Sequence, residues 1–182
     1  MMSETRFPLR VLVTDPSERF QLSFAEQGAA VLAGFSGVQT QSSARGLIIN
    51  GVAERDISAA VAMLRVAIPA VAVGAVEVVY LDQGSTEPWV RVRVTTPADR
   101  QGDVVAQLVQ RRGLIEGVED TPDVGKIVVA TAPLARLLGY DQAVAATTGG
   151  IAIADYEFIG YRPIQRDAPD LPLAPDGKSG NI

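Results

Sequence analysis

The chain contains no cysteine and no histidine among its 182 residues. The absence of cysteine excludes disulfides and thiolate metal sites, and the absence of histidine excludes imidazole ligands, nucleophiles activated by histidine and imidazole-based pH switches. A metal site built from carboxylates alone would need a cluster of acids at ligand spacing, and the sequence has none. We therefore expect no cofactor and no metal, and no enzyme of the classes that depend on them.

The sequence also lacks an apolar run approaching the roughly 18 residues of a membrane span, and it has no signal-peptide pattern. We therefore expect a cytoplasmic protein with no membrane partner. Lysine and arginine number 16 against 21 acids, which gives a net charge of −5. Proteins that bind nucleic acid mainly through phosphates usually carry a basic face, so nonspecific binding to DNA or RNA is disfavoured. With 47% hydrophobic residues, the chain can bury two small cores.

The first half of the sequence predicts the order strand, helix, strand, strand, helix, strand. The first helix is expected to begin at Pro16, because Asp15 and Glu18 around it form a capping-box pattern, and its buried side is expected to include Phe20 and Phe24. Gly74 predicts a bulge or bend in the last strand. The expected strands are 7–14, 37–42, 47–52 and 71–81, and the expected helices run from Pro16 to about Ala33 and from Glu54 to Ile68.

The second half repeats this order with a period of about 80 residues. Valines alternate with Arg91 and Arg93 along its first strand, and its first helix is expected to end in Arg111 and Arg112 with Gly113 as the C-cap glycine. The expected strands are 88–95, 114–119, 126–131 and 151–158, and the expected helices run from Pro97 to Arg112 and from Pro133 to about Ala146.

Each half is the split β-α-β pattern of a ferredoxin-like fold, so the predicted class is α+β. Each domain should have an antiparallel sheet with two helices on one face and the other face open to a partner. The expected domains are residues 1–84 and 85–162. Residues 163–182 are rich in proline and have little periodicity, which predicts a mostly disordered tail.

Three motifs in the second half occur in a characteristic order. The chain reads EPWVRVRVTTP at residues 87–97, RRG at 111–113 and PLARLLGY at 133–140. In this order and spacing, the half resembles the C-terminal, fifth domain of elongation factor G and its relatives, including the ribosomal protection proteins. The resemblance implies a ferredoxin-like fold and a place in the translation apparatus.

The first half is similar to the third domain of the same family. The resemblance rests on the segment from Gly51 to Ile57 and on VGAVEVVY at 73–80, although Ala53 and Asp56 replace a glycine and a histidine of the family pattern. A GxxxxGK[ST] phosphate loop is missing, and residue 82 runs almost directly into the second half. The resemblance therefore covers the third and fifth domains without the GTPase, second and fourth domains, and implies a non-catalytic protein.

Four arginines are candidate contacts to RNA or a partner. Arg111 and Arg112 match the RRG motif, which the family fold places near ribosomal RNA or neighbouring domains, but two cations in the last turn of a helix also complement its dipole. Arg91 and Arg93 share one strand face, where they would either contact RNA or pair with acids of neighbouring strands such as Glu116 or Asp155.

The loop at residues 147–150 matches the T-x-G loop of the family, which makes Thr148 and Gly150 candidate phosphate contacts. The family carries arginines around this loop, whereas this chain has Ala145 and Ile151 there, which favours a plain turn.

Two functions follow from these patterns. In the first, the chain is a binding module of the translation apparatus that docks on the ribosome or on a translational GTPase through its open sheet faces. In the second, it is a structural protein that forms a homodimer through those faces, which would be apolar at 47–49 and 76–80, and it does not bind the ribosome. The sequence leaves the partner and the oligomeric state open.

Overall fold

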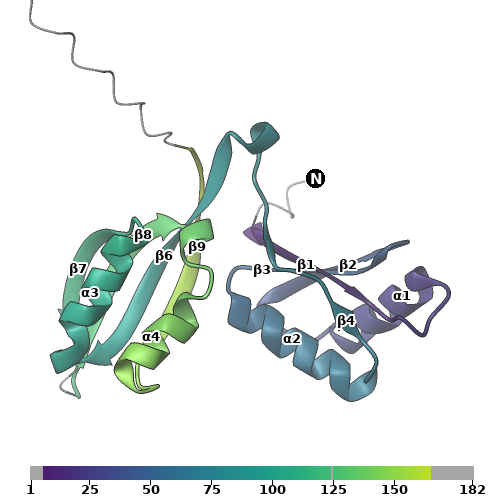
Figure 1. Cartoon of the computed structure of the whole chain (residues 1–182), viewed down its shortest axis with the longest axis horizontal. Coiled ribbons are helices and arrows are strands. Elements are labelled where there is room, and N and C mark those ends of the chain that lie inside the picture. The colour runs from purple at the N-terminus through teal and green to yellow at the C-terminus, as the bar shows by residue number, and fades with distance from the viewer. Residues whose placement is uncertain (1–5, 124, 165–182) are drawn as a thin grey trace, which may run out of the picture.

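The computed structural model describes residues 6–123 and 125–164 of the chain. It contains two antiparallel sheets, each with its helices on one face (Figure 1). This arrangement confirms the predicted α+β class with two ferredoxin-like domains. Within the described residues, no helix is long and apolar enough to cross a membrane.

The first domain has its sheet strands in the order β2-β3-β1-β4, and β5 also pairs with β1. Along β1, Leu9, Val11 and Val13 point into the core and are almost completely buried. The elements are β1 (Leu9–Thr14), α1 (Gln21–Val31), β2 (Val38–Ser43), β3 (Gly46–Gly51), α2 (Glu54–Ala67), β4 (Ala72–Val73) and β5 (Glu77–Val78).

The second domain has the strand order β7-β8-β6-β9, and α3 and α4 cover one face of this sheet (Figure 1). Its core contains Val90, Val92 and Val94 of the central strand, together with Leu108 and Tyr140 of the helices. The elements are β6 (Thr86–Pro97), α3 (Gln101–Gln110), β7 (Leu114–Asp120), β8 (Gly125–Pro133), α4 (Tyr140–Thr148) and β9 (Ile153–Pro163).

The start of α1 differs from the prediction. The helix begins at Gln21 because the Asp15 carboxylate accepts hydrogen bonds from the backbone N–H of Ser17 at 2.9 Å and from its hydroxyl at 2.6 Å, which stabilises a turn. The Gln21 side chain also donates to the Asp15 carbonyl at 2.7 Å. The expected capping box is therefore wrong. Phe24 is buried as expected, but Phe20 is 69% exposed.

The two helices of the second domain also begin later than predicted. Pro97 and Pro133 are the last residues of β6 and β8, with ψ angles of 147° and 129°, and a short 3₁₀ turn follows each of them. Proline fixes φ near the value of a helix but leaves ψ free, so an X-Pro pattern suits the end of a strand equally well. Gly139, in a left-handed conformation with φ of 71°, separates the second 3₁₀ turn from α4.

The expected strand at residues 71–81 is divided into β4 and β5. The chain bends at Gly74, whose N–H donates to the carbonyl of Leu12 at 2.9 Å. A Cβ atom at Gly74 would lie 3.1 Å from that carbonyl oxygen, so the close approach favours glycine. The expected irregularity at Gly74 is present.

The helix-free face of the first sheet is less apolar than the sequence suggested. Leu47 and Ile49 are completely buried beneath the helices, and only Ile48 of this segment turns outward. Arg10 lies on the outer face and donates to the Asn50 side chain at 3.4 Å. The expectation that segment 47–49 offers an apolar outer face is therefore wrong, because strand alternation leaves one isoleucine there.

The two domains contact each other through the first turn of α2. Arg55 forms an ion pair with Asp155 of β9 at 2.6 Å and donates to the carbonyl of Ala154. The carboxylate of Glu54 accepts the N–H of Gly139 at 2.6 Å, at the start of α4. The first turn of α2 thus joins the domains by charge-assisted hydrogen bonds.

Most of the expected tail lies outside the described residues. Pro163, where we placed its beginning, is the last residue of β9 and pairs with Thr86. Ile164 then donates its N–H to the carbonyl of Ser85 at 2.9 Å. Pro163 and Ile164 are therefore both held by backbone hydrogen bonds beside the start of β6.

Candidate functional site

The site lies on the helix-free face of the second sheet and is built by strand alternation along β6. Because successive side chains point to opposite faces, the buried valines lie beneath the helices and Trp89, Arg91 and Arg93 lie on the open face. The face has two parts with different chemistry. One part contains ion pairs, and the other is an apolar hollow with charged residues at its rim.

The ionic part neutralises the two strand arginines. The guanidinium of Arg91 lies 3.0 Å from Glu116 and 3.5 Å from Glu157, and that of Arg93 lies 2.9 Å from Glu119. Glu157 lies on β9, next to β6, whereas Glu116 and Glu119 lie on β7, on the far side of β8. Pairing of Arg91 with Glu116 is therefore present, whereas Asp155 pairs with Arg55 of the first domain. Three carboxylates therefore surround the two guanidinium groups, which lowers the positive potential of this part of the face, and the contact of Arg91 and Arg93 to RNA stays a prediction.

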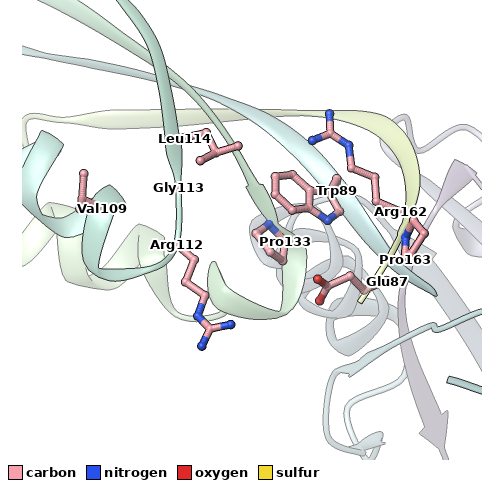
Figure 2. Close-up of a pocket in the computed structure, with 9 residues that line it drawn as sticks. All are labelled: Glu87, Trp89, Val109, Arg112, Gly113, Leu114, Pro133, Arg162 and Pro163. Carbon is pink, nitrogen blue, oxygen red and sulfur yellow. The ribbon is translucent and has the colours of Figure 1, made fainter. Parts of the chain in front are cut away.

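The apolar part is a hollow with a volume of about 620 Å³, shown in Figure 2. Its walls come from the start of β6, the end of β8, the end of β9, the last turn of α3 and the turn between α3 and β7. The lining residues are Glu87, Trp89, Val109, Arg112, Gly113, Leu114, Pro133, Arg162 and Pro163. We call this hollow the Trp89 pocket.

Trp89 is the central side chain of the pocket. Its strand partners are Pro133 on β8 and Gly160 on β9. The guanidinium carbon of Arg162 lies 4.3 Å from the centre of the indole ring, a cation–π contact visible in Figure 2. The indole N–H is buried and has no hydrogen-bond partner among the residues that the structure describes. The pocket thus combines an aromatic body with a stacked cation.

Arg112 reaches the pocket because of an uncommon helix end. The N–H of Gly113 donates to the Leu108 carbonyl at 2.8 Å and that of Arg112 donates to the Val109 carbonyl at 3.0 Å, which is a Schellman motif. Arg112 itself has φ of 61° and is the left-handed residue. The expected glycine cap is therefore wrong by one position. Gly113 has a different role, because a Cβ there would lie 2.8 Å from the Leu108 carbonyl oxygen.

The two arginines of the RRG motif have separate roles. Arg111 donates to the carbonyl of Arg136 at 3.2 Å, and its guanidinium carbon lies 5.4 Å from the ring centre of Tyr140, the first residue of α4. Burial raises the pKa of Tyr140, while the nearby Arg111 lowers it in part. Arg111 therefore belongs to the packing between α3 and α4, and Arg112 belongs to the pocket.

Thr148 and Gly150 do not line the Trp89 pocket. The Thr148 side chain is buried, its hydroxyl donates to the Val144 carbonyl at 2.7 Å, and it accepts the N–H of Ala152 at 3.1 Å. Gly150 has φ of 81° and donates its N–H to Ala145 at 2.7 Å. These contacts complete the turn between α4 and β9, and they already use the Thr148 hydroxyl as donor and as acceptor.

The structure thus brings only Arg112 of the six candidate residues into the pocket. Sequence reasoning missed Trp89 and Arg162, which face each other across two strands far apart in the chain. One sequence signal could have indicated Trp89: it is the single tryptophan of the chain, and strand alternation places it on the same face as Arg91 and Arg93. Across the described ranges, no group of three or more acidic side chains is arranged to hold a metal ion.

Comparison with known proteins gives two findings. Residues 85–171 match the family described as elongation factor G C-terminus. A crystal structure of a protein from Thermus thermophilus superposes with a TM-score of 0.58 and 16% sequence identity over 87% of this chain. The chain spans 41% of the length of that protein, and at this identity the likeness shows the fold.

Proposed function

We propose that this chain, whose second half matches the family described as elongation factor G C-terminus, is a binding module of the translation apparatus that docks on the ribosome or on a translational GTPase. In this proposal, the first half corresponds to the third domain of that family, and the protein works in the cytoplasm without hydrolysing nucleotide. The match of residues 85–171 is the observation that carries the proposal.

The docking surface that we propose is the Trp89 pocket with Arg112 and Arg162. Tryptophan and arginine in a partly desolvated hollow are the residue types that contribute most to binding energy at protein interfaces. Val109 and Leu114 at the rim are 56% and 58% exposed and offer apolar area to a partner. The ionic part of the same face consists instead of charged side chains that pair with one another, Arg91 with Glu116 and Arg93 with Glu119.

Sedimentation with purified ribosomes, and with a purified translational GTPase, tests this proposal over a series of salt concentrations. Replacing Arg112 and Arg162 with glutamine should weaken binding. If each arginine contacts a phosphate, the slope of log affinity against log salt should fall by about one unit for each. The matched control replaces Arg45 and Arg65, two exposed arginines of the first domain that do not line the pocket, with glutamine, and it should leave affinity nearly unchanged. The proposal is contradicted if the chain binds neither the ribosome nor the GTPase at any salt concentration.

The homodimer alternative keeps only part of the apolar surface that motivated it. In segment 47–49, Leu47 and Ile49 are buried and Arg10 lies on the outer face, whereas Tyr80 of segment 76–80 is 42% exposed. Sedimentation equilibrium of the free protein provides the direct comparison. We expect a monomer.

A further inference from the structure

The Trp89 pocket is an exposed apolar hollow, which a soluble domain seldom leaves uncovered. Its rim residues Val109 and Leu114 are more than half exposed, and its walls include Trp89, Pro133 and Pro163. The volume of about 620 Å³ is in the range of sites that bind a short peptide segment or a small molecule. The pocket therefore predicts an occupant with apolar and negatively charged groups.

Residues 165–182 of the same chain begin at the wall of this pocket. Pro163 lines the pocket, and Ile164 is held at Ser85 by its backbone hydrogen bond of 2.9 Å. Leu171 follows Ile164 by seven residues. A polyproline helix rises about 3.1 Å per residue, so seven residues could span about 20 Å. Reach is therefore sufficient for residues beyond 167 to turn back onto the pocket.

The chemistry of this segment complements the pocket. Residues 167–176 read DAPDLPLAPD, with prolines and two leucines between three aspartates. Proline-rich segments bind grooves lined by aromatic side chains at a low entropy cost. Trp89 provides the aromatic surface, and Arg112 and Arg162 provide cations for the aspartates. The leucines and aspartates of the segment therefore each have a chemical counterpart in the pocket.

We propose that residues 167–176 bind the Trp89 pocket of their own chain, with Leu171 and Leu173 against Trp89 and Leu114 and with aspartates near Arg112 and Arg162. Tethering gives the segment an effective concentration in the millimolar range, so even a weak intrinsic affinity keeps the pocket occupied. The segment would then regulate the docking surface, because a translation partner would have to displace it. This regulatory role rests on the proposed function. Occupancy of the pocket itself is independent of that function.

Trp89 is the only tryptophan of the chain, so its fluorescence reports on the pocket directly. The test compares the full chain with the variant carrying Leu171→Ser and Leu173→Ser, measuring the emission maximum and acrylamide quenching. We expect a red shift and stronger quenching in this variant, with recovery on addition of a synthetic peptide of residues 165–182. The matched control, Lys178→Ser with Asn181→Ser, should behave like the unchanged chain. A second variant, Asp167→Asn with Asp170→Asn, should shift in the same direction and by less.

Unchanged Trp89 emission and quenching in the leucine variant, with no response to the peptide, overturns the inference. A signal that depends on protein concentration also overturns it, because the occupant would then be the segment of a second copy. No ribosome or GTPase is present in this assay, so its result is separate from the sedimentation test. If both proposals hold, the leucine variant should sediment with its translation partner at lower concentration than the unchanged chain.

Discussion

At the scale of one residue, Arg112 combines a strained backbone with an exposed positive charge. Its φ of 61° places a side chain with a Cβ in the left-handed region that glycine adopts without penalty. The chain nevertheless has arginine at this position and glycine at the next one, where contact with Leu108 forbids a Cβ. Backbone strain next to a pocket is an indication of function, since a residue chosen for stability alone would relieve it.

Replacing Arg112 with glycine should therefore raise the free energy of unfolding by about 0.5 to 1 kcal/mol, while it removes a cation from the Trp89 pocket. The control is Arg112→Ala, which keeps the left-handed strain and also removes the cation, and it should give no stabilisation. Urea denaturation followed by circular dichroism measures both variants. If glycine and alanine give the same stability, the strain at this position is not relieved by glycine, and the argument fails.

At the scale of an element, the end of α4 is held by a hydroxyl that the sequence pattern assigned to phosphate binding. Thr148 links the last turn of the helix to the start of β9, because it donates to Val144 and accepts from the N–H of Ala152. Both partners are local, and the side chain is 4% exposed. Burial of this hydroxyl and its two local hydrogen bonds support the role of a cap, and the phosphate contact of Thr148 stays a prediction.

Replacing Thr148 with valine keeps the shape of the side chain but leaves the buried N–H of Ala152 without its acceptor. The expected cost is about 1 to 3 kcal/mol of folding free energy, which is the penalty of an unsatisfied buried donor. Thr148→Ser is the matched control, since it keeps the hydroxyl, and it should cost clearly less. Thermal and urea denaturation of both variants give the comparison. Equal losses in the two variants would mean that the methyl group, and not the hydrogen bond, stabilises this turn.

At the scale of the whole molecule, the first turn of α2 connects the domains. Arg55 and Asp155 are 42% and 64% exposed, so their ion pair should contribute only about 0 to 1 kcal/mol to stability. We expect this ion pair to fix the relative orientation of the domains, together with the hydrogen bond between Glu54 and the N–H of Gly139. Desolvation raises the pKa of the adjacent Asp56, and the charge of Arg55 lowers it in part.

Replacing Arg55 with alanine should change the relative orientation of the domains much more than it changes stability. Residual dipolar couplings measured on the two domains should no longer fit one rigid body, and the pKa of Asp56 should rise further because a nearby cation is lost. A raised pKa in the folded state means that the folded chain holds this proton more tightly than the unfolded chain. The free energy of unfolding should therefore fall as pH rises above 3.8, the ordinary pKa of an aspartate, and it should fall further in Arg55→Ala. Arg65→Ala, in the last turn of the same helix, is the control. Unchanged couplings in Arg55→Ala would exclude this contact as the determinant of orientation.

The sequence by itself determined which faces of the strands and helices are buried, and hence the ferredoxin-like architecture. Alternation along 89–94 placed the valines in the core and Arg91 and Arg93 on the open face, and the spacing of Ile57, Val61 and Leu64 oriented α2. These signals are local, because a period of two or of 3.6 residues is written into a single segment. The expected domain boundaries remain a prediction.

Only the tertiary structure decided where the helices begin and which residues form the site. Side-chain hydrogen bonds of Asp15 and Gln21 delayed α1, and the free ψ angle of Pro97 and Pro133 let both prolines end strands. The Trp89 pocket brings together Arg112 and Arg162 from segments far apart in the chain, and no local period encodes such a separation. Competition between hydrogen bonds, and contacts between distant segments, are therefore what the sequence pattern left undetermined.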